Sequence, residues 1–145
     1  MSTAPGLVPS IVKTVVVPID QARAFELFTA GIGTWWPLAT HSVGGETSRG
    51  VAVTSTAIVE TLEDGTTTSW GEVVAWQPPS RFVVTWHPGS DAGPEQTQVA
   101  VSFEPASGGT LVRLEHSGWE RIAPARRDNY DSGWDVVLGA FVSAA

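Results

Sequence analysis

The sequence SWGEVVAWQPPSRFVVTWH, residues 69–87, decides the fold because it predicts a β-hairpin. Two runs rich in Val, Trp and Phe flank a turn at residues 77–80, where two prolines remove ladder donors and pre-set the turn geometry. Side chains alternate along a strand, so Phe82, Val84 and Trp86 should share one apolar face. That face needs an apolar partner, either a helix of the same chain or a ligand.

Further strands are expected on both sides of this hairpin. Residues 11–17 are apolar and β-branched, and the Thr- and Val-rich residues 51–62 predict one bent strand or two. Alternating apolar side chains predict two more strands at 96–103 and 110–116. Because the connections are short, the strands should form an antiparallel meander.

Helical spacing of apolar residues occurs near both ends of the chain. Asp20 is a good N-cap for a helix that ends before Gly31, and a short turn or helix should carry Trp35 and Trp36. Residues 128–145 predict an amphipathic helix that packs on the apolar hairpin face. Its apolar stripe consists of Tyr130, Trp134, Val137, Leu138 and Phe141. The expected fold is therefore α+β, with a curved antiparallel sheet wrapped around a long C-terminal helix and two short N-terminal helices.

The composition excludes several classes of function. A chain of 145 residues fits one domain, expected at 10–145 after a loose segment at 1–9. No apolar run reaches the roughly 20 residues of a membrane span and no signal peptide is visible, which predicts a cytoplasmic location. With no Cys there is no disulfide or thiolate chemistry, and a net charge of −7 disfavours nucleic acid. No cofactor or metal motif is found, so neither is expected.

Seven Trp against one Tyr are the unusual feature of the composition. Each Trp can be core packing or the wall of an apolar pocket, and Trp86 and Trp134 are the best pocket candidates because they lie on facing surfaces. Trp35 and Trp36 are adjacent and diverge by about 100° on a helix, so only one is expected to face inward. The other would cap the pocket or meet a partner.

The histidines offer polar candidates. His116 shares its strand face with Val112 and Leu114, and is either a satisfied core residue or a polar anchor for a ligand. His41 lies in a long loop after Pro37, where function is common. His87, at the end of a strand, is expected to be solvated.

Two strand carboxylates, Glu60 and Glu72, have two interpretations. They pair with arginines such as Arg49, Arg81 or Arg113 across the sheet, which we favour, or they face the cavity. A carboxylate buried near Trp would have a raised pKa and could act as a general acid.

Several short segments follow one another in a characteristic order and spacing. They are Phe25-Glu26-Leu27-Phe28, Trp35-Trp36-Pro37-Leu38, His41-Ser42-Val43, Glu60, Asp64-Gly65, Trp70-Gly71-Glu72-Val73, Pro78-Pro79-Ser80-Arg81-Phe82, Trp86, Phe103-Glu104-Pro105, Gly109-Thr110, His116-Ser117-Gly118 and Gly133-Trp134. In these segments the sequence resembles the START-like (SRPBCC, birch-pollen-allergen-like) superfamily. Within it, the chain looks most like the family named after the C-terminal domain of the activator of heat-shock-protein-90 ATPase.

The resemblance implies a helix-grip fold with a cavity between the sheet and the last helix, but no single activity. Our leading hypothesis is a domain that binds a small hydrophobic or aromatic molecule. Its predicted site residues are the walls Trp36, Trp70, Trp86 and Trp134 and the polar anchors His41, Glu60 and His116.

Two alternatives stay open. The first is a cyclase- or hydrolase-like enzyme, which needs Glu60 or Glu72 to point inward together with His116. The second is a protein-interaction domain that uses exposed Trp, with a chaperone as a possible partner. A homodimer is also possible.

Overall fold

The predicted hairpin lies in the middle of the sheet in the computed structural model, which describes residues 9–88, 96–122 and 124–145. Strands β4 (Thr67–Gln77) and β5 (Arg81–Trp86) pair antiparallel about the expected turn. In the segment 1–9, which is expected to be loose, Pro9 alone is described. In the loop expected at 88–94, Pro88 alone is described, and the rest of both segments lies outside the described residues.

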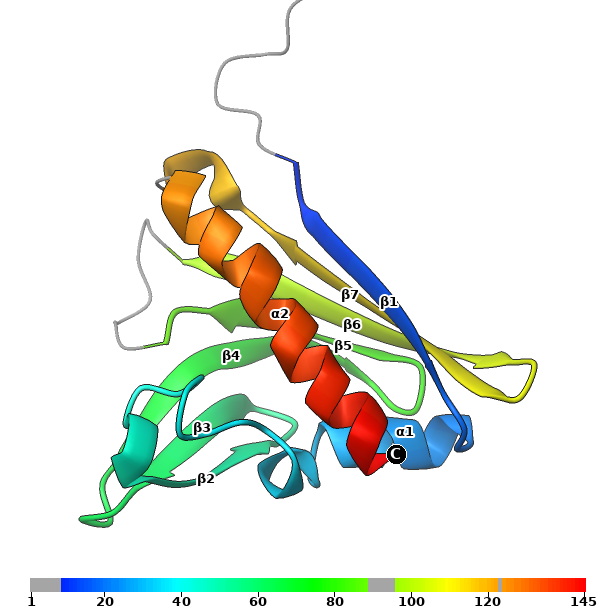
Figure 1. The fold of residues 1–145 in the computed structure, drawn as a ribbon, viewed down its shortest axis with the longest axis horizontal. Helices are drawn as coiled ribbons and strands as arrows, with labels where there is room; N and C mark the ends of the chain where they lie inside the picture. The colour runs from blue at the N-terminus through cyan, green and yellow to red at the C-terminus, as the bar shows by residue number, and fades with distance from the viewer. Residues whose placement is uncertain (1–8, 89–95, 123) are drawn as a thin grey trace, which may run out of the picture.

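Seven antiparallel strands form one curved sheet in the order β1-β7-β6-β5-β4-β3-β2 (Figure 1). The other strands are β1 (Ile11–Val17), β2 (Ser48–Val53), β3 (Ala57–Leu62), β6 (Thr97–Ala106) and β7 (Gly109–Ser117). The stretch 51–62 is thus two strands, because the Thr54 hydroxyl accepts from the N–H groups of Thr56 and Ala57 (both 3.3 Å) and closes a turn. The first strand of the chain pairs with the last, with Ile11 opposite His116.

The helices largely follow the sequence prediction. Helix α1 (Gln21–Phe28) begins after Asp20, whose carboxylate accepts from the Arg23 N–H at 2.8 Å. The second expected short helix is one 3-10 turn, η1 (Ile32–Thr34), and two more such turns are η2 (Gly45–Thr47) and η3 (Trp119–Arg121). The C-terminal helix α2 (Pro124–Ala144) begins four residues earlier than expected.

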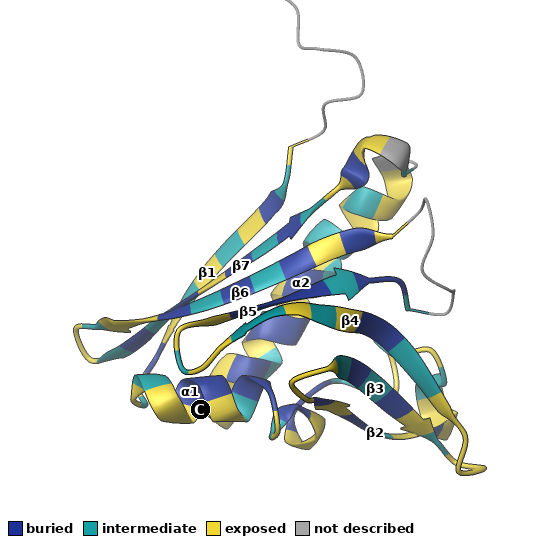
Figure 2. Cartoon of the chain, turned by 180° about the vertical axis from the view of Figure 1, so that it is seen from behind, coloured by how far each residue is buried: buried dark blue, intermediate teal, exposed yellow. Residues whose placement is uncertain are grey.

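Helix α2 lies across the concave face of the sheet and buries its apolar stripe there (Figures 1 and 2). The Trp134 ring lies 5.4 Å from that of Trp86 on β5, as expected for the two facing surfaces. At the sheet edge, Lys13 of β1 pairs with Asp131 (3.0 Å) and Asp135 (3.1 Å) of α2. The α+β helix-grip prediction is therefore confirmed.

The prediction that only one of Trp35 and Trp36 faces inward is wrong, because both are buried. Their side chains point in different directions as expected, but buried apolar side chains contact each of the two rings. Trp35 contacts Phe28 and Phe141, whereas Trp36 contacts the other tryptophans near α2. Neither indole is left to meet a partner.

No Trp is exposed, although all seven lie in the described residues: six are buried and Trp76 is half-buried. The expectation of exposed Trp, on which the interaction-domain and homodimer hypotheses drew, is therefore wrong. The large exposed apolar side chains are Val12, Val16, Val43, Val74, Val136 and Val142.

Candidate functional site

A pocket of about 410 Å³ lies between α2, the sheet and the loop that follows η1. Its described lining residues are Trp36, Thr40, His41, Ser42, Val43, Trp70, Trp86, Pro88, Asn129, Tyr130, Gly133, Trp134 and Val137. This set contains no Asp, Glu, Lys or Arg. The described part of the lining is therefore uncharged, aromatic on one side and polar near His41.

Four indoles form the apolar wall, and each packs against its neighbours. The ring centroids of Trp36 and Trp70 lie 5.1 Å apart, those of Trp70 and Trp86 5.8 Å, and those of Trp36 and Trp134 5.9 Å. Rings at these distances gain from edge-to-face and tilted contact in addition to burial. The wall is thus a preformed aromatic surface.

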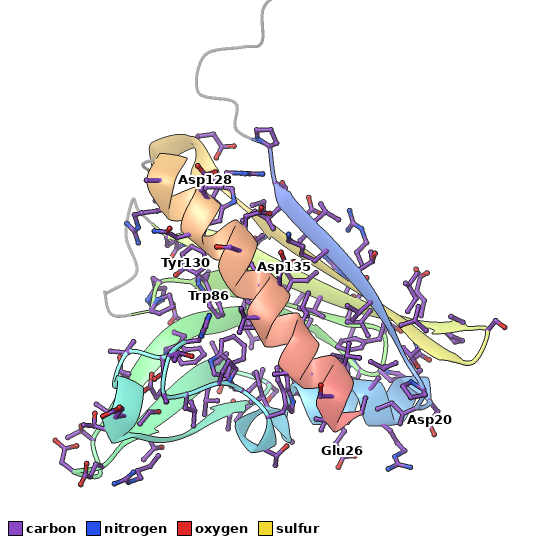
Figure 3. The ribbon with its side chains drawn as sticks, viewed as in Figure 1. Asp20, Glu26, Trp86, Asp128, Tyr130 and Asp135 are labelled. Carbon is purple, nitrogen blue, oxygen red and sulfur yellow. The ribbon has the colours of Figure 1, made fainter. Side chains whose placement is uncertain are left out.

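Hydrogen bonds fix three of the four indoles. The Trp36 N–H donates to the His41 carbonyl (2.7 Å), the Trp70 N–H to Glu60 (2.8 Å) and the Trp134 N–H to His116 (3.0 Å). The Trp86 N–H is buried without a partner among the described residues. Figure 3 shows Trp86 near Tyr130, which belongs to the N-terminal half of α2.

His116 is buried behind this wall and does not line the pocket. Its Nδ1 accepts from the Trp134 N–H, so Nε2 carries the proton and donates to the Thr97 hydroxyl (2.6 Å). Burial lowers the pKa of His116 to about 3, and the ring is neutral. The satisfied-core interpretation thus describes its position, and its ring contacts the lining residues Trp86, Tyr130 and Trp134 from behind.

Glu60 is completely buried and also lies behind the lining. Its carboxylate accepts from the N–H groups of Val43 (3.0 Å) and Gly44 (2.9 Å) and from Trp70. Burial raises the pKa of Glu60, but the hydrogen bonds from these donors together lower it by more than burial raises it. The pKa of Glu60 therefore lies below the ordinary value of 4.5.

The favoured pairing of Glu60 with an arginine and the rise in its pKa are therefore both wrong, whereas the side chain does point into the interior, behind Trp70. No described arginine pairs with it, because Arg49 pairs with Glu63 and Arg113 with Glu115. Its pKa is lowered instead of raised, because backbone and indole N–H groups take the place of a cation. Glu60 holds the loop that carries His41 and Val43 against the sheet.

Glu72 lies on the outer face of the sheet, where its side chain is 51% exposed. It pairs with His87 (3.1 Å), and no arginine of the described residues forms an ion pair with it. His87 is buried, so the prediction that it is solvated is wrong: the neighbouring strand and this carboxylate cover it. Neither residue lines the pocket.

His41 borders the pocket, and its loop fixes its position. Its N–H donates to the Pro37 carbonyl (2.9 Å), its carbonyl accepts from Trp36, and its Nδ1 lies 2.7 Å from the Thr40 hydroxyl. Across the pocket, a Cβ built on Gly133 of α2 would lie 3.9 Å from His41 Nε2. The imidazole edge therefore faces a part of α2 that has no side chain.

The structure brings five of the seven predicted site residues to the pocket: Trp36, His41, Trp70, Trp86 and Trp134. Sequence reasoning missed Thr40, Asn129, Tyr130 and Gly133 as lining residues. Tyr130 could have been found, because it lies one helical turn before Trp134 in the predicted stripe. Thr40 and Asn129 gave no such signal.

Within the described residues, no group of three His, Cys, Asp or Glu side chains could hold a metal ion. No helix in the same part of the chain is long and apolar enough to cross a membrane.

A curved antiparallel sheet that grips a long helix defines the helix-grip class of proteins, and this chain has that arrangement. The chain belongs to the family described as activator of Hsp90 ATPase homolog 1-like protein, which it matches over residues 19–145. This confirms the family resemblance. No curated protein matches the sequence.

Solved structures show the same fold. Txn09, an anthrahydroquino-γ-pyrone synthase, is 25% identical, with a TM-score of 0.64 over 98% of this chain and 100% of its own. The Aha1 dimer from Colwellia psychrerythraea is 16% identical (TM-score 0.68; 94% and 96% covered). DynU16, from the dynemicin biosynthetic locus, is 15% identical, with a TM-score of 0.69 over 92% of this chain and 46% of its own.

Proposed function

We propose that this protein binds a flat, uncharged aromatic molecule in the pocket under α2. The observation that carries the proposal is the pocket itself: four buried indoles surround about 410 Å³, and no described lining residue is charged. This volume lies within the usual range of small-molecule sites. Rigid indole faces favour planar rings, and an uncharged lining disfavours phosphates and carboxylates, which would lose hydration without a counter-charge.

The pocket also favours a ligand with an oxygen at one end. Thr40, His41, Asn129 and Tyr130 supply polar side chains to the same pocket. A ligand acceptor that reached the unpartnered Trp86 N–H would remove a burial penalty of about 1–3 kcal/mol. An aromatic ketone or phenol carries an oxygen that can bond these polar side chains and can accept from the Trp86 N–H.

The likeness to Txn09 supports the same ligand class. Its description names a synthase of an anthrahydroquinone-γ-pyrone, a fused aromatic product that carries oxygens, and the match spans almost all of both chains. We extend to this chain the chemical class of the ligand, namely fused aromatic rings with oxygen substituents.

Calorimetric titration with 2-acetylnaphthalene, a planar uncharged ketone, tests this function. We expect a Kd of about 100 μM or tighter and at least about tenfold weaker binding in Trp86→Ala, which removes a pocket wall. Trp76→Phe is the control, because Trp76 packs on Phe25 and Phe82 away from the pocket and should bind normally. Heat of binding that is absent in the wild type, or equal in Trp86→Ala, would contradict the proposal.

A second candidate function is interaction with a protein, which the family description supports. The Aha1 dimer among the similar structures makes a homodimer the simplest form of such an interaction. A chaperone partner, a homodimer and a cytoplasmic location stay predictions. Sedimentation equilibrium over a hundredfold concentration range would detect the dimer.

A further inference from the structure

His41 is the histidine of the described lining, and an imidazole can accept a proton. The described lining contains no carboxylate and no lysine. The three groups that the sequence offered for proton transfer lie elsewhere: Glu60 and His116 are behind the wall, and Glu72 is on the outer face. Among the described lining residues, His41 is therefore the candidate for a general base.

The Thr40 hydroxyl lies 2.7 Å from His41 Nδ1, and the tautomer of the ring decides which of the two donates. The tautomer that would serve as a base at Nε2 is the one in which Nδ1 donates to the Thr40 oxygen. With the proton on Nδ1, Nε2 carries a lone pair. No described residue donates to Nε2 in the structure.

The lone pair lies at the edge of the space that a ligand would occupy. His41 and Gly133 both line the pocket, and a Cβ on Gly133 would approach His41 Cδ2 and Nε2 at 3.8 and 3.9 Å. Because a Cβ at residue 133 would already contact the imidazole, the ring packs close to the helix backbone there, and a ligand atom would reach Nε2 from the part of the pocket beside Gly133. Asn129 and Tyr130, on the preceding turn of α2, line the same space and can donate to a ligand oxygen.

We propose that His41 is a catalytic base that enolises an aromatic ketone bound on the indole wall. Nε2 takes a proton from the carbon next to the ketone, and the C–H electron pair becomes the C=C bond of the enolate. The carbonyl π pair moves to the oxygen, which Tyr130 or Asn129 can stabilise. The imidazolium then returns the proton to carbon or to oxygen, so the step needs no oxidant and no cofactor. The inference rests on the proposed function, because the ketone must first bind.

Hydrogen–deuterium exchange measures this step directly. The methyl protons of 2-acetylnaphthalene are followed by ¹H NMR in D₂O, with and without protein. We expect the protein to accelerate exchange by about 100-fold over buffer, the usual contribution of a positioned base. His41→Gln should lose this acceleration even at a ketone concentration that calorimetry shows to saturate the variant.

Thr40→Val is the second variant, since it removes the hydroxyl that orients the ring and leaves Nε2 in place. As a positioning residue, Thr40 should lower the exchange rate by about tenfold at a ketone concentration that saturates the variant, an effect that a loss of binding alone would not produce. Trp76→Phe should match the wild type in both measurements.

Two outcomes separate the two proposals. If 2-acetylnaphthalene binds but exchanges no faster than in buffer, or exchanges equally fast with His41→Gln, the assignment of His41 is overturned and the binding function stands. If the ketone does not bind, the proposed function fails and the assignment of His41 fails with it.

Discussion

Glu60 keeps a charge in the protein interior without a cation. Each carboxylate oxygen has its own donor, from Val43 and Gly44 of the pocket loop, and Trp70 adds a third. Hydrogen bonds to an ionised group are roughly twice as strong as neutral ones, which offsets the loss of hydration. One side chain thereby connects β3, β4 and the loop that carries His41.

Glu60→Gln should lower the free energy of unfolding at pH 7 by about 2–3 kcal/mol, because an amide faces the same N–H groups with one acceptor oxygen instead of two. Urea denaturation measures this change. Glu63→Gln is the control: this exposed carboxylate pairs with Arg49 at the surface and should change stability by less than about 1 kcal/mol. Equal effects of the two substitutions would show that Glu60 is not held as described.

The pocket depends on how close two elements come, the loop at residues 37–47 and helix α2. Hydrogen bonds with the Trp36 indole and the Glu60 carboxylate fix the loop from the protein interior. On the helix, Gly133 has no side chain next to His41. Glycine in a helix interior usually destabilises by about 1 kcal/mol relative to alanine. At this position the helix backbone lies close to the His41 ring, which a Cβ on residue 133 would meet at 3.8 Å.

Gly133→Leu should weaken binding of 2-acetylnaphthalene by at least about tenfold, because a leucine side chain occupies the space before the imidazole. Gly139→Leu is a matched control on the same helix, since a Cβ there meets nothing within 4 Å. Both substitutions should raise helix propensity, and only the first should change the Kd measured by calorimetry. Normal binding to Gly133→Leu would place the ligand elsewhere.

For the whole molecule, periodicity made the architecture predictable. The period-two pattern of β5 and β6 and the three- and four-residue steps of α2 determine which side chains face inward, and the structure agrees. The fates of Glu60, His87 and the Trp35-Trp36 pair were not predictable. Each depends on which loop or strand covers it, and that is decided by tertiary contacts that have no local pattern.

The buried His116 should make the entire fold sensitive to acid. Its pKa falls from 6.5 to about 3 on folding, so the unfolded chain binds the proton more tightly. The stability due to this neutral ring is present above pH 6.5 and is lost as the pH falls toward 3, by up to about 1.4 kcal/mol per unit. Glu60, with its lowered pKa, adds a further loss below about pH 4.5.

Urea denaturation at pH 7 and pH 5 tests the histidine contribution. The wild type should lose about 2 kcal/mol more than His116→Gln between these two values. The glutamine can still accept from Trp134 and donate to Thr97, but it does not titrate. An identical loss in the variant would assign the acid sensitivity to other groups.

The pairing of β1 with β7 has a consequence for the order in which the protein can form during synthesis. Strand β1 is synthesised about a hundred positions before its partner residues 110–116, and contacts so distant in sequence form slowly. Until β7 has been made, β1 has no neighbour in the sheet, since all its ladder bonds are to β7. The nascent domain therefore keeps an unpaired, valine-rich strand during the synthesis of all the strands between them.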